Sequence, residues 1–456
     1  MVEISGIVIE IFALGGDGSS VLSRGNTSGI VLFFALFGYF ISHFFGRIIK
    51  KLFKRELELF ISFSFALLAS LALIVFAWQY ESAAETIAFV TVCGIWGGWF
   101  SAFFDIWFRI KKKAEGAREK LKKASAADNA WDESAIVDHA KQIFIKFQED
   151  WSSFNTESMS TYMTPSYLQH NSLLMRILSE VQRANRVSNV DIEKVAVVEV
   201  LDRVDNTKDK ITVSFIASSK NELIDTKTNK VLFTDKSSFA EYWTFNRSGS
   251  TWLLDKIDRE TADKVSADKG LARFASKNKM FYALNMGWLF LPQKGELFGT
   301  SKFGKSDINN HFVGTYHDHL VQLYTYLPKA SNTGWSLVVS QINLPKYYGG
   351  IIIKPKKDRS GRNLEHKKID GYTKFKFEWP DFNKRYEVYA TDADKLATFE
   401  LLNQAFMSYL YDTDPDTAIE VTDNVVYLYK KLRKNRSSDY KIMMEILLKS
   451  SRELKL

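Results

Sequence analysis

Three long apolar runs mark the beginning of the chain, and the pattern changes to ordinary polar and apolar alternation after them. The runs cover residues 29–45, 57–78 and 86–108. A membrane-spanning helix needs about 20 predominantly apolar residues, which the second and third runs reach, whereas the first is slightly shorter. The pattern predicts a three-span α-helical membrane anchor over 29–108, preceded by an extracytoplasmic tail over 1–28.

Basic residues flank these runs unevenly. Lys and Arg follow the first and third runs, whereas the connection 79–85 carries two glutamates and neither Lys nor Arg. Because cytoplasmic segments carry the excess of Lys and Arg, we expect a multi-pass topology with the N-terminus outside and the large C-terminal region in the cytoplasm. Residues 1–28 contain only one basic residue, Arg24, which argues against a cleaved signal peptide.

Two glycines in the third run, Gly94 and Gly98, form a G-x-x-x-G pattern. Such a pattern allows two helices to approach closely. It has two interpretations: close packing within the three-span unit, or a contact between copies of the chain in a homo-oligomer.

A basic linker over 109–131 follows the third run. Its first part, 109–123, contains eight Lys or Arg and two Glu. A helix here would lie beside the inner membrane surface, where anionic lipid attracts each basic residue by roughly 1 kcal/mol; the alternative is a solvated flank that only stops transfer. The candidate lipid-facing residues are Lys111, Lys112, Lys113, Arg118, Lys120, Lys122 and Lys123.

Length, charge and cysteine content restrict the remaining possibilities. A chain of 456 residues is too long for one ordinary core, so we expect more than one domain. Eight basic and two acidic residues in 109–123 account for six of the eight net positive charges, and we therefore predict no nucleic-acid partner. The single cysteine, Cys93, excludes an intrachain disulfide and a cysteine-based metal site.

Apolar spacing beyond the linker indicates an α+β domain. Helical spacing runs from Ile136 to Trp151, and a helix–turn segment follows over 160–184. Period-two patterns come next, and a short SGST turn joins the last two of them. Helices followed by antiparallel strands are typical of α+β domains. The predicted strands cover 194–203, 210–218, 238–247 and 252–257.

The last two strands carry a recurrent motif. Residues 240–257 read AEYWTFNRSGSTWLLDKI, in which an acidic residue and W-x-F-x-R precede W-x-L. Over about 132–258 the chain resembles the C-terminal domain of the mitochondrial import inner membrane translocase subunit 44 family. The resemblance implies a cone-shaped, nuclear-transport-factor-like or cystatin-like fold, with helices on a curved antiparallel sheet and an apolar groove. It also implies binding to proteins and lipid, and it brings no catalytic residues.

Two features depart from that family: the predicted anchor, and the lack of a mitochondrial presequence. Together they favour a bacterial plasma membrane. We predict that Trp243, Phe245 and Trp252 belong to the core. The candidate partner groove consists of Tyr162, Met163 and Tyr167, in the helix–turn segment that faces the sheet.

A second α+β domain is expected over 259–456. Its stretch FNKRYEVYATDADKLATFELLNQAFM resembles a bacterial membrane-associated domain family of unknown function, over about 270–430. Residues 417–430 predict a tight strand pair. The C-terminal end predicts a basic amphipathic helix, which folds back on the domain or lies on the membrane.

One stretch suggests an enzyme. Residues 299–306 read GTSKFGKS, which fits the P-loop pattern G-x-x-x-x-G-K-[ST]. A P-loop opens a helix, whereas the residues after Ser306 alternate as in strands, and we interpret the stretch as a loop. An alternative function is therefore a nucleotide hydrolase that uses Lys305 and Ser306, or a cone-fold domain that processes a small ligand.

Histidines near residue 317 suggest a metal site. His311, His317 and His319 would share one face of a single strand and could hold zinc. However, residues 317–319 fall where a hairpin should turn, so we predict a polar turn and no metal.

The sequence thus predicts a membrane-tethered, non-enzymatic scaffold. Its cytoplasmic domains bind a protein partner and anionic lipid at the inner membrane surface. We predict no catalytic residue, cofactor or metal ion. The sequence does not identify the partner.

Overall fold

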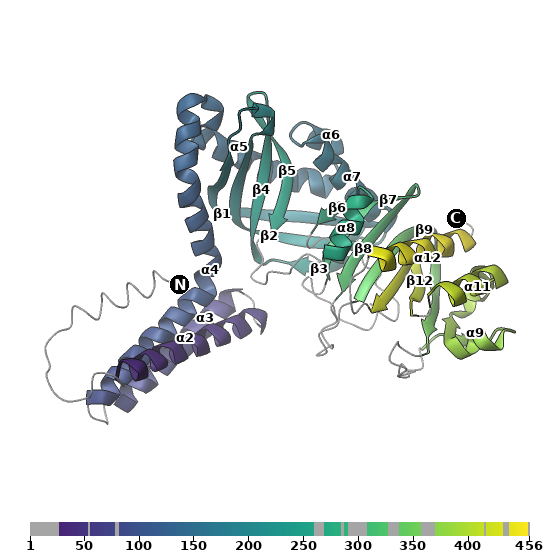
Figure 1. Cartoon of the computed structure of the whole chain (residues 1–456), viewed down its shortest axis with the longest axis horizontal. Coiled ribbons are helices and arrows are strands. Elements are labelled where there is room, and N and C mark those ends of the chain that lie inside the picture. The colour runs from purple at the N-terminus through teal and green to yellow at the C-terminus, as the bar shows by residue number, and fades with distance from the viewer. Residues whose placement is uncertain are drawn as a thin grey trace. The chain divides into compact units, whose positions relative to one another are not determined.

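The computed structural model separates into two compact units, Met1–Arg109 and Ile110–Leu456. Each unit is described by itself, with the element labels of Figure 1. The structure describes residues 27–52, 55–77, 82–259, 269–283, 287–290, 308–326, 337–356, 370–414, 416–431 and 437–454.

The first unit consists of α2 (Thr27–Leu52), α3 (Arg55–Ala77) and the N-terminal half of α4 (Ser82–Ala127). Two indole N–H groups of α4 bind serine hydroxyls of α3. Trp96 Nε1 donates to Ser70 Oγ at 3.1 Å, and Trp99 Nε1 donates to Ser62 Oγ at 3.0 Å. These bonds join α3 to α4 because each pairs a polar group that would otherwise lie among apolar side chains.

Gly94 and Gly98 of α4 lie against α2. A Cβ atom on Gly94 would stand 2.2 Å from the Ala35 carbonyl oxygen, and one on Gly98 would stand 2.2 Å from the Tyr39 carbonyl oxygen. Only glycine permits so close an approach between two helix backbones. The G-x-x-x-G pattern therefore serves a contact within the chain. A homo-oligomer stays a prediction.

The prediction of a three-span anchor is wrong. In the described part of the chain, no helix offers a stretch that is both long and apolar enough to cross a membrane. The multi-pass topology and the plasma-membrane location depended on that anchor and are corrected with it. The prediction rested on the length of the apolar runs in the sequence alone.

The second unit begins with a domain of three helices on a five-stranded antiparallel sheet (Figure 1). The strand order is β1-β2-β4-β5, and β3 pairs with β2. Bulges interrupt β1 between Ser188 and Asp191 and at two later points, and bulges bend a strand. The elements are α5 (Glu133–Ser153), α6 (Thr156–Ser160), α7 (Pro165–Glu180), β1 (Arg183–Leu201), β2 (Lys210–Asp225), β3 (Val231–Asp235), β4 (Ser238–Ser248) and β5 (Thr251–Arg259).

An aromatic core joins α5 to this sheet. Asp132 caps the helix, since its carboxylate accepts a hydrogen bond from the Ala135 N–H at 2.8 Å. Phe144 of α5 stacks on Phe215 of β2 at 4.5 Å and lies 4.9 Å from Trp243 of β4. The prediction that Trp243, Phe245 and Trp252 belong to the core is confirmed: all three are buried. The α+β part of the predicted fold class is also consistent with the structure.

A second domain follows, built on a seven-stranded antiparallel sheet of order β10-β11-β9-β8-β7-β6, in which β12 pairs with β9. The strands are β6 (Phe281–Ala283), β7 (Ile308–Tyr316), β8 (His319–Tyr326), β9 (Leu337–Pro355), β10 (Thr373–Phe375), β11 (Tyr386–Ala390) and β12 (Ala418–Lys431). The helices are α8 (Lys269–Lys277), α9 (Pro380–Arg385), α10 (Lys395–Leu401), α11 (Gln404–Thr413) and α12 (Ser437–Glu453).

Two turns were predicted in this domain, and the structure contains one of them. His317 and Asp318 have φ of 47° and 65° and join β7 to β8, which confirms the predicted polar turn, although His319 already begins β8. The predicted strand pair over 417–430 is wrong, because β12 is one strand that follows β9 along its length. Asp423, with φ of 50°, makes a bulge there in place of a turn.

Candidate functional site

The C-terminal half of α4 is an amphipathic helix fixed to the first domain. Its buried residues recur at helical spacing and include Ala117, Leu121 and Ala124, which belong to the same core as Trp243. Such a stripe holds one side of a helix against the domain and leaves the other side in solvent. The predicted linker is therefore a structured part of the domain surface.

All seven predicted lipid-facing residues lie on the exposed side of this helix. Lys113 places its ammonium 4.0 Å from the centre of the Tyr242 ring, and Lys111 forms an exposed pair with Glu115 at 3.8 Å. Among the described residues, the other five have no ion-pair partner: Lys112, Arg118, Lys120, Lys122 and Lys123. The exposed side of α4 is thus strongly positive. We call the seven residues the basic cluster.

The end of α4 is held by residues of the W-x-F-x-R…W motif. Arg247 pairs with Asp128 at 2.5 Å and with the buried Asp209 at 3.2 Å. The Trp252 indole donates to the Ala130 carbonyl at 3.0 Å, and its ring lies 4.8 Å from that of Trp131. The sequence reading treated these motif residues as core or family markers and missed that they position the basic cluster.

The three predicted groove residues lie together where α6 leads into α7. Tyr162 and Met163 are buried, with 5% and 2% of their surface exposed, whereas Tyr167 is half-buried. The backbone here pairs with β5, because the Leu254 N–H donates to the Tyr162 carbonyl at 2.8 Å. The burial of Tyr162 and Met163 leaves little of either side chain for a partner, so a groove lined by these residues stays a prediction.

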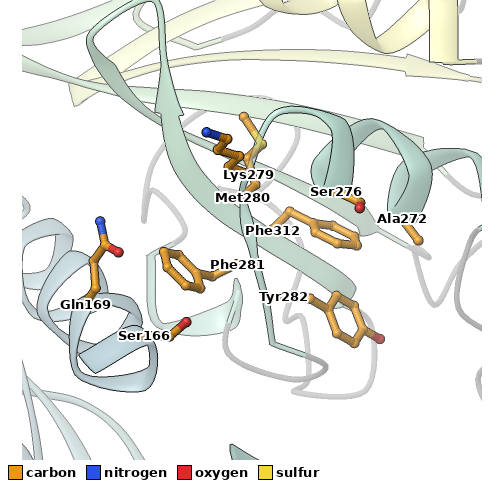
Figure 2. A pocket seen from close by; sticks show the side chains of 9 residues that line it. All are labelled: Ser166, Gln169, Ala272, Ser276, Lys279, Met280, Phe281, Tyr282 and Phe312. Atoms are coloured by element: carbon orange, nitrogen blue, oxygen red, sulfur yellow. The ribbon is translucent and has the colours of Figure 1, made fainter. Parts of the chain in front are cut away.

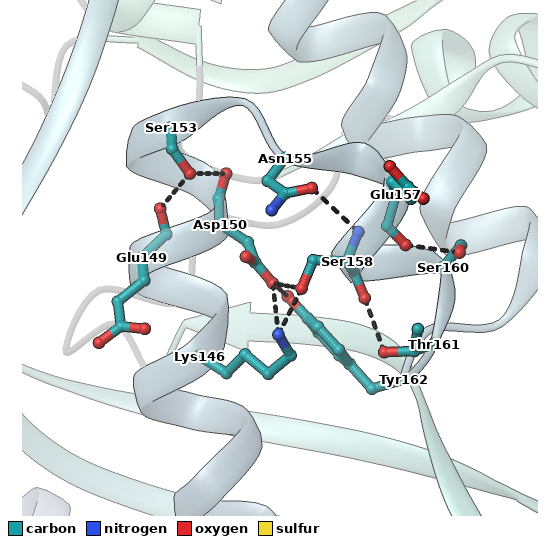
Figure 3. A network of polar contacts seen from close by, with 10 residues as sticks. All are labelled: Lys146, Glu149, Asp150, Ser153, Asn155, Glu157, Ser158, Ser160, Thr161 and Tyr162. Atoms are coloured by element: carbon teal, nitrogen blue, oxygen red, sulfur yellow. Dashed lines mark hydrogen bonds and ion pairs between the residues drawn. The ribbon is translucent and has the colours of Figure 1, made fainter.

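A polar network fixes Tyr162 (Figure 3). Its hydroxyl donates to the Asp150 carboxylate at 2.9 Å, and Asp150 also accepts from Ser158 Oγ at 2.7 Å. Lys146 lies 3.5 Å from the same carboxylate. Burial, followed by the hydrogen bond to Asp150, raises the pKa of Tyr162, so the phenol stays protonated as a donor. The network joins α5 to α6.

The P-loop-like stretch 299–306 lies outside the described residues. The first described element after it is the strand β7, which agrees with the predicted strand pattern, whereas a P-loop opens a helix.

The three histidines proposed for zinc do not come together as ligands. His311 is buried on β7, with Nε2 at 2.9 Å from Gln322 Oε1, and His317 lies in the exposed turn. Within the described ranges, no three His, Cys, Asp or Glu residues are placed to hold a metal ion.

Residues 117–259 match the Tim44-like domain family. The match ends with β5 and begins inside α4, as expected from the packing of this helix on the sheet. It confirms the resemblance read from the W-x-F-x-R motif. The second resemblance, over about 270–430, stays a prediction.

Two solved structures are similar to parts of the chain. The mycobacterial trehalose monomycolate transport factor A, TtfA, is 11% identical, with 41% of this chain and 96% of that chain covered at a TM-score of 0.29. The intermembrane space region of the chloroplast protein ARC6 is 16% identical, with 28% and 97% covered at a TM-score of 0.22. At these scores neither likeness carries an argument. No curated protein sequence matches the chain.

Proposed function

We propose that this chain is a non-enzymatic scaffold whose basic cluster binds an anionic lipid surface from outside the bilayer. The observation that carries the proposal is the concentration of seven exposed basic side chains on a helix whose opposite side is buried in the Tim44-like domain. A helix held in this way presents its charges without first having to fold, so less conformational entropy is lost on binding.

The charge of the basic cluster by itself is enough to give measurable affinity for an anionic lipid surface. Each Lys or Arg near an anionic surface contributes roughly 1 kcal/mol, and roughly 1.4 kcal/mol corresponds to a tenfold change in affinity. Several residues acting together therefore change binding by at least about a hundredfold. Because the charges are exposed, added salt should weaken the interaction over a Debye length of about 8 Å at physiological ionic strength.

The test compares two full-length variants on vesicles of phosphatidylglycerol and phosphatidylcholine. In the first variant the basic cluster is changed to Gln, and we expect binding that is weaker by at least about a hundredfold and is sensitive to salt. The control loses the same number of charges at exposed lysines elsewhere: Lys208, Lys227, Lys230, Lys236, Lys376, Lys384 and Lys441.

Equal losses in the two variants would show that only net charge matters and would refute the proposal. Tighter binding of the wild type to duplex DNA than to the vesicles would favour a nucleic-acid partner instead.

A protein partner is the second part of the proposal. It is supported by the family resemblance and by the match over 117–259. A photo-crosslinking residue in place of the half-buried Tyr167 should give a discrete crosslinked protein in intact cells. The same residue at the exposed Asn206 serves as the control position. Indistinguishable crosslinking patterns would count against a groove at this segment.

A further inference from the structure

A pocket of about 660 Å³ lies where α7 of the Tim44-like domain meets the second domain (Figure 2). Sites for small ligands in proteins occupy roughly 300–1,000 Å³ and often lie at such junctions. The lining residues come from α7, from α8 and the turn after it, and from β6 and β7: Ser166, Gln169, Ala272, Ser276, Lys279, Met280, Phe281, Tyr282 and Phe312.

One side of the pocket is aromatic. The rings of Tyr282 and Phe312 lie 4.7 Å apart. Phe281 stacks on His170 of α7, at 5.1 Å and with an interplanar angle of 9°. His170 is only 7% exposed, so Phe281 is supported from behind. These rings offer a rigid apolar surface on which a flat ligand could lie.

The rest of the lining carries polar side chains that are exposed at the rim of the pocket. Among the described residues, the side chains of Ser166, Gln169, Ser276 and Lys279 form no hydrogen bond or ion pair with one another or with other groups. Figure 2 shows Ser166 and Gln169 on one wall and Lys279 at another corner. The lining contains this one cation and no carboxylate.

Lys279 is held in an uncommon conformation. Its φ is 55°, in the left-handed region that costs a side-chain-bearing residue roughly 1–2 kcal/mol. Its N–H donates to the Ser276 carbonyl at 3.2 Å, and the next N–H, of Met280, donates to the Ala275 carbonyl at 2.8 Å. These bonds end α8 and fix the backbone from which the Lys279 side chain extends.

We propose that this pocket binds a small amphipathic anion, such as an aromatic carboxylate or sulfonate. The apolar body lies on the aromatic side, the anionic group pairs with Lys279, and the hydroxyls and amide supply further hydrogen bonds. Burial, with a smaller effect of Asp258, raises the pKa of Tyr282 to about 12. The phenol is therefore neutral and does not oppose an anion. The proposal does not depend on lipid binding by the basic cluster.

The test uses two fluorescent probes with the full chain. Anilinonaphthalene sulfonate carries an anionic group, and N-phenylnaphthylamine has nearly the same apolar body without charge. Lys279→Gln should weaken binding of the sulfonate at least fivefold and leave binding of the neutral probe unchanged. Ala272→Trp should abolish the pocket-bound component of both, because the indole fills the space. Lys277→Gln is the matched control. It removes an exposed charge at the end of α8, two residues before Lys279 and outside the lining.

Two results would overturn the proposal: equal effects of Lys279→Gln on both probes, or equal effects of Lys277→Gln and Lys279→Gln on the sulfonate. Thermal melts show whether each variant remains folded. Competition by laurate or by benzoate identifies whether an acyl or an aromatic body is preferred. Vesicle binding of Lys279→Gln should remain normal, so failure of the pocket and failure of the basic cluster are distinguishable.

Discussion

The two antiparallel sheets of the second unit bury different chemistry. The sheet of the Tim44-like domain turns an apolar face toward α5, where Phe144, Phe215 and Trp243 form one aromatic cluster. The sheet of the second domain has one apolar face under α8 and α12. Its other face combines apolar side chains of the core that it shares with the Tim44-like domain, such as Val339 and Val425, with buried polar side chains on several strands.

Those polar side chains form a ladder. Gln322 of β8 lies opposite Gln341 of β9, which in turn lies opposite Tyr427 of β12. Gln341 accepts from the Tyr324 hydroxyl at 2.9 Å and donates to the Phe290 carbonyl at 2.9 Å. An apolar face is stabilised by the area it buries, whereas a buried polar face is stable only if its groups stay paired. The two sheets should therefore respond differently to substitution.

The largest effect is expected in the apolar sheet. Trp243→Ala should reduce the free energy of unfolding by roughly 3–5 kcal/mol, because it removes a fully buried indole and leaves a cavity. Urea unfolding of the full chain, followed by circular dichroism, measures it. A loss below about 1 kcal/mol would show that this sheet does not depend on its aromatic cluster.

Acid should destabilise the fold through two buried histidines, His170 and His311, that lie beside the polar ladder. Burial lowers the pKa of His170 to about 3, with His311 contributing, and burial lowers that of His311 to about 4. In the unfolded chain both pKa values lie near 6.5. Below that pH the unfolded state therefore binds more protons than the folded state does. The stability from the two neutral rings is complete above about pH 6.5 and is lost as the pH falls toward 4.

Between about pH 7.5 and about pH 5.5 the free energy of unfolding should fall by about 2.5 kcal/mol, as measured by urea unfolding at each pH. His170→Phe keeps a ring against Phe281 and should remove about half of the pH dependence. His317→Asn changes a histidine in the exposed turn and is the control. Equal pH dependence in the wild type and His170→Phe would contradict the assignment.

Replacing a buried polar side chain of the second sheet by an apolar one should lower the free energy of unfolding without creating a large cavity. Gln341→Leu keeps a similar volume but leaves the Tyr324 hydroxyl and the Phe290 carbonyl unpaired. We expect a loss of roughly 2 kcal/mol. Adding Tyr324→Phe removes one of the orphaned groups and should restore part of the loss. A double variant that is less stable than Gln341→Leu would argue that the ladder contributes by packing alone.

The smallest effect is expected at Tyr162. Tyr162→Phe removes one hydrogen bond from Asp150, which keeps its contacts with Ser158 and Lys146. A loss of roughly 1 kcal/mol follows, and a thermal melt detects it. Gln142→Ala, at an exposed position of the same helix α5, should be neutral. If Tyr162→Phe were equally neutral, its hydroxyl would not be part of the structural network.

Local features of both domains of the second unit could be predicted from the sequence. The helical spacing from Ile136 to Trp151, the alternation in 210–218 and 238–247, and the turn at His317 and Asp318 all depend on residues close together in the chain. Backbone periodicity and turn chemistry act over such short distances. The basic residues of α4 could also be located, because their charge does not depend on the fold.

The tertiary structure decided the features that join distant residues. Gln341 looks like a surface residue in the sequence, but its partners Tyr324 and Phe290 are 17 and 51 positions away. Tyr162 and Met163 looked accessible in a helix–turn segment, yet pairing with β5 buries them. Likewise β12 is continuous because a long partner strand lies beside it. In each case burial and pairing depend on which segments meet, and the period of one segment does not specify its neighbour.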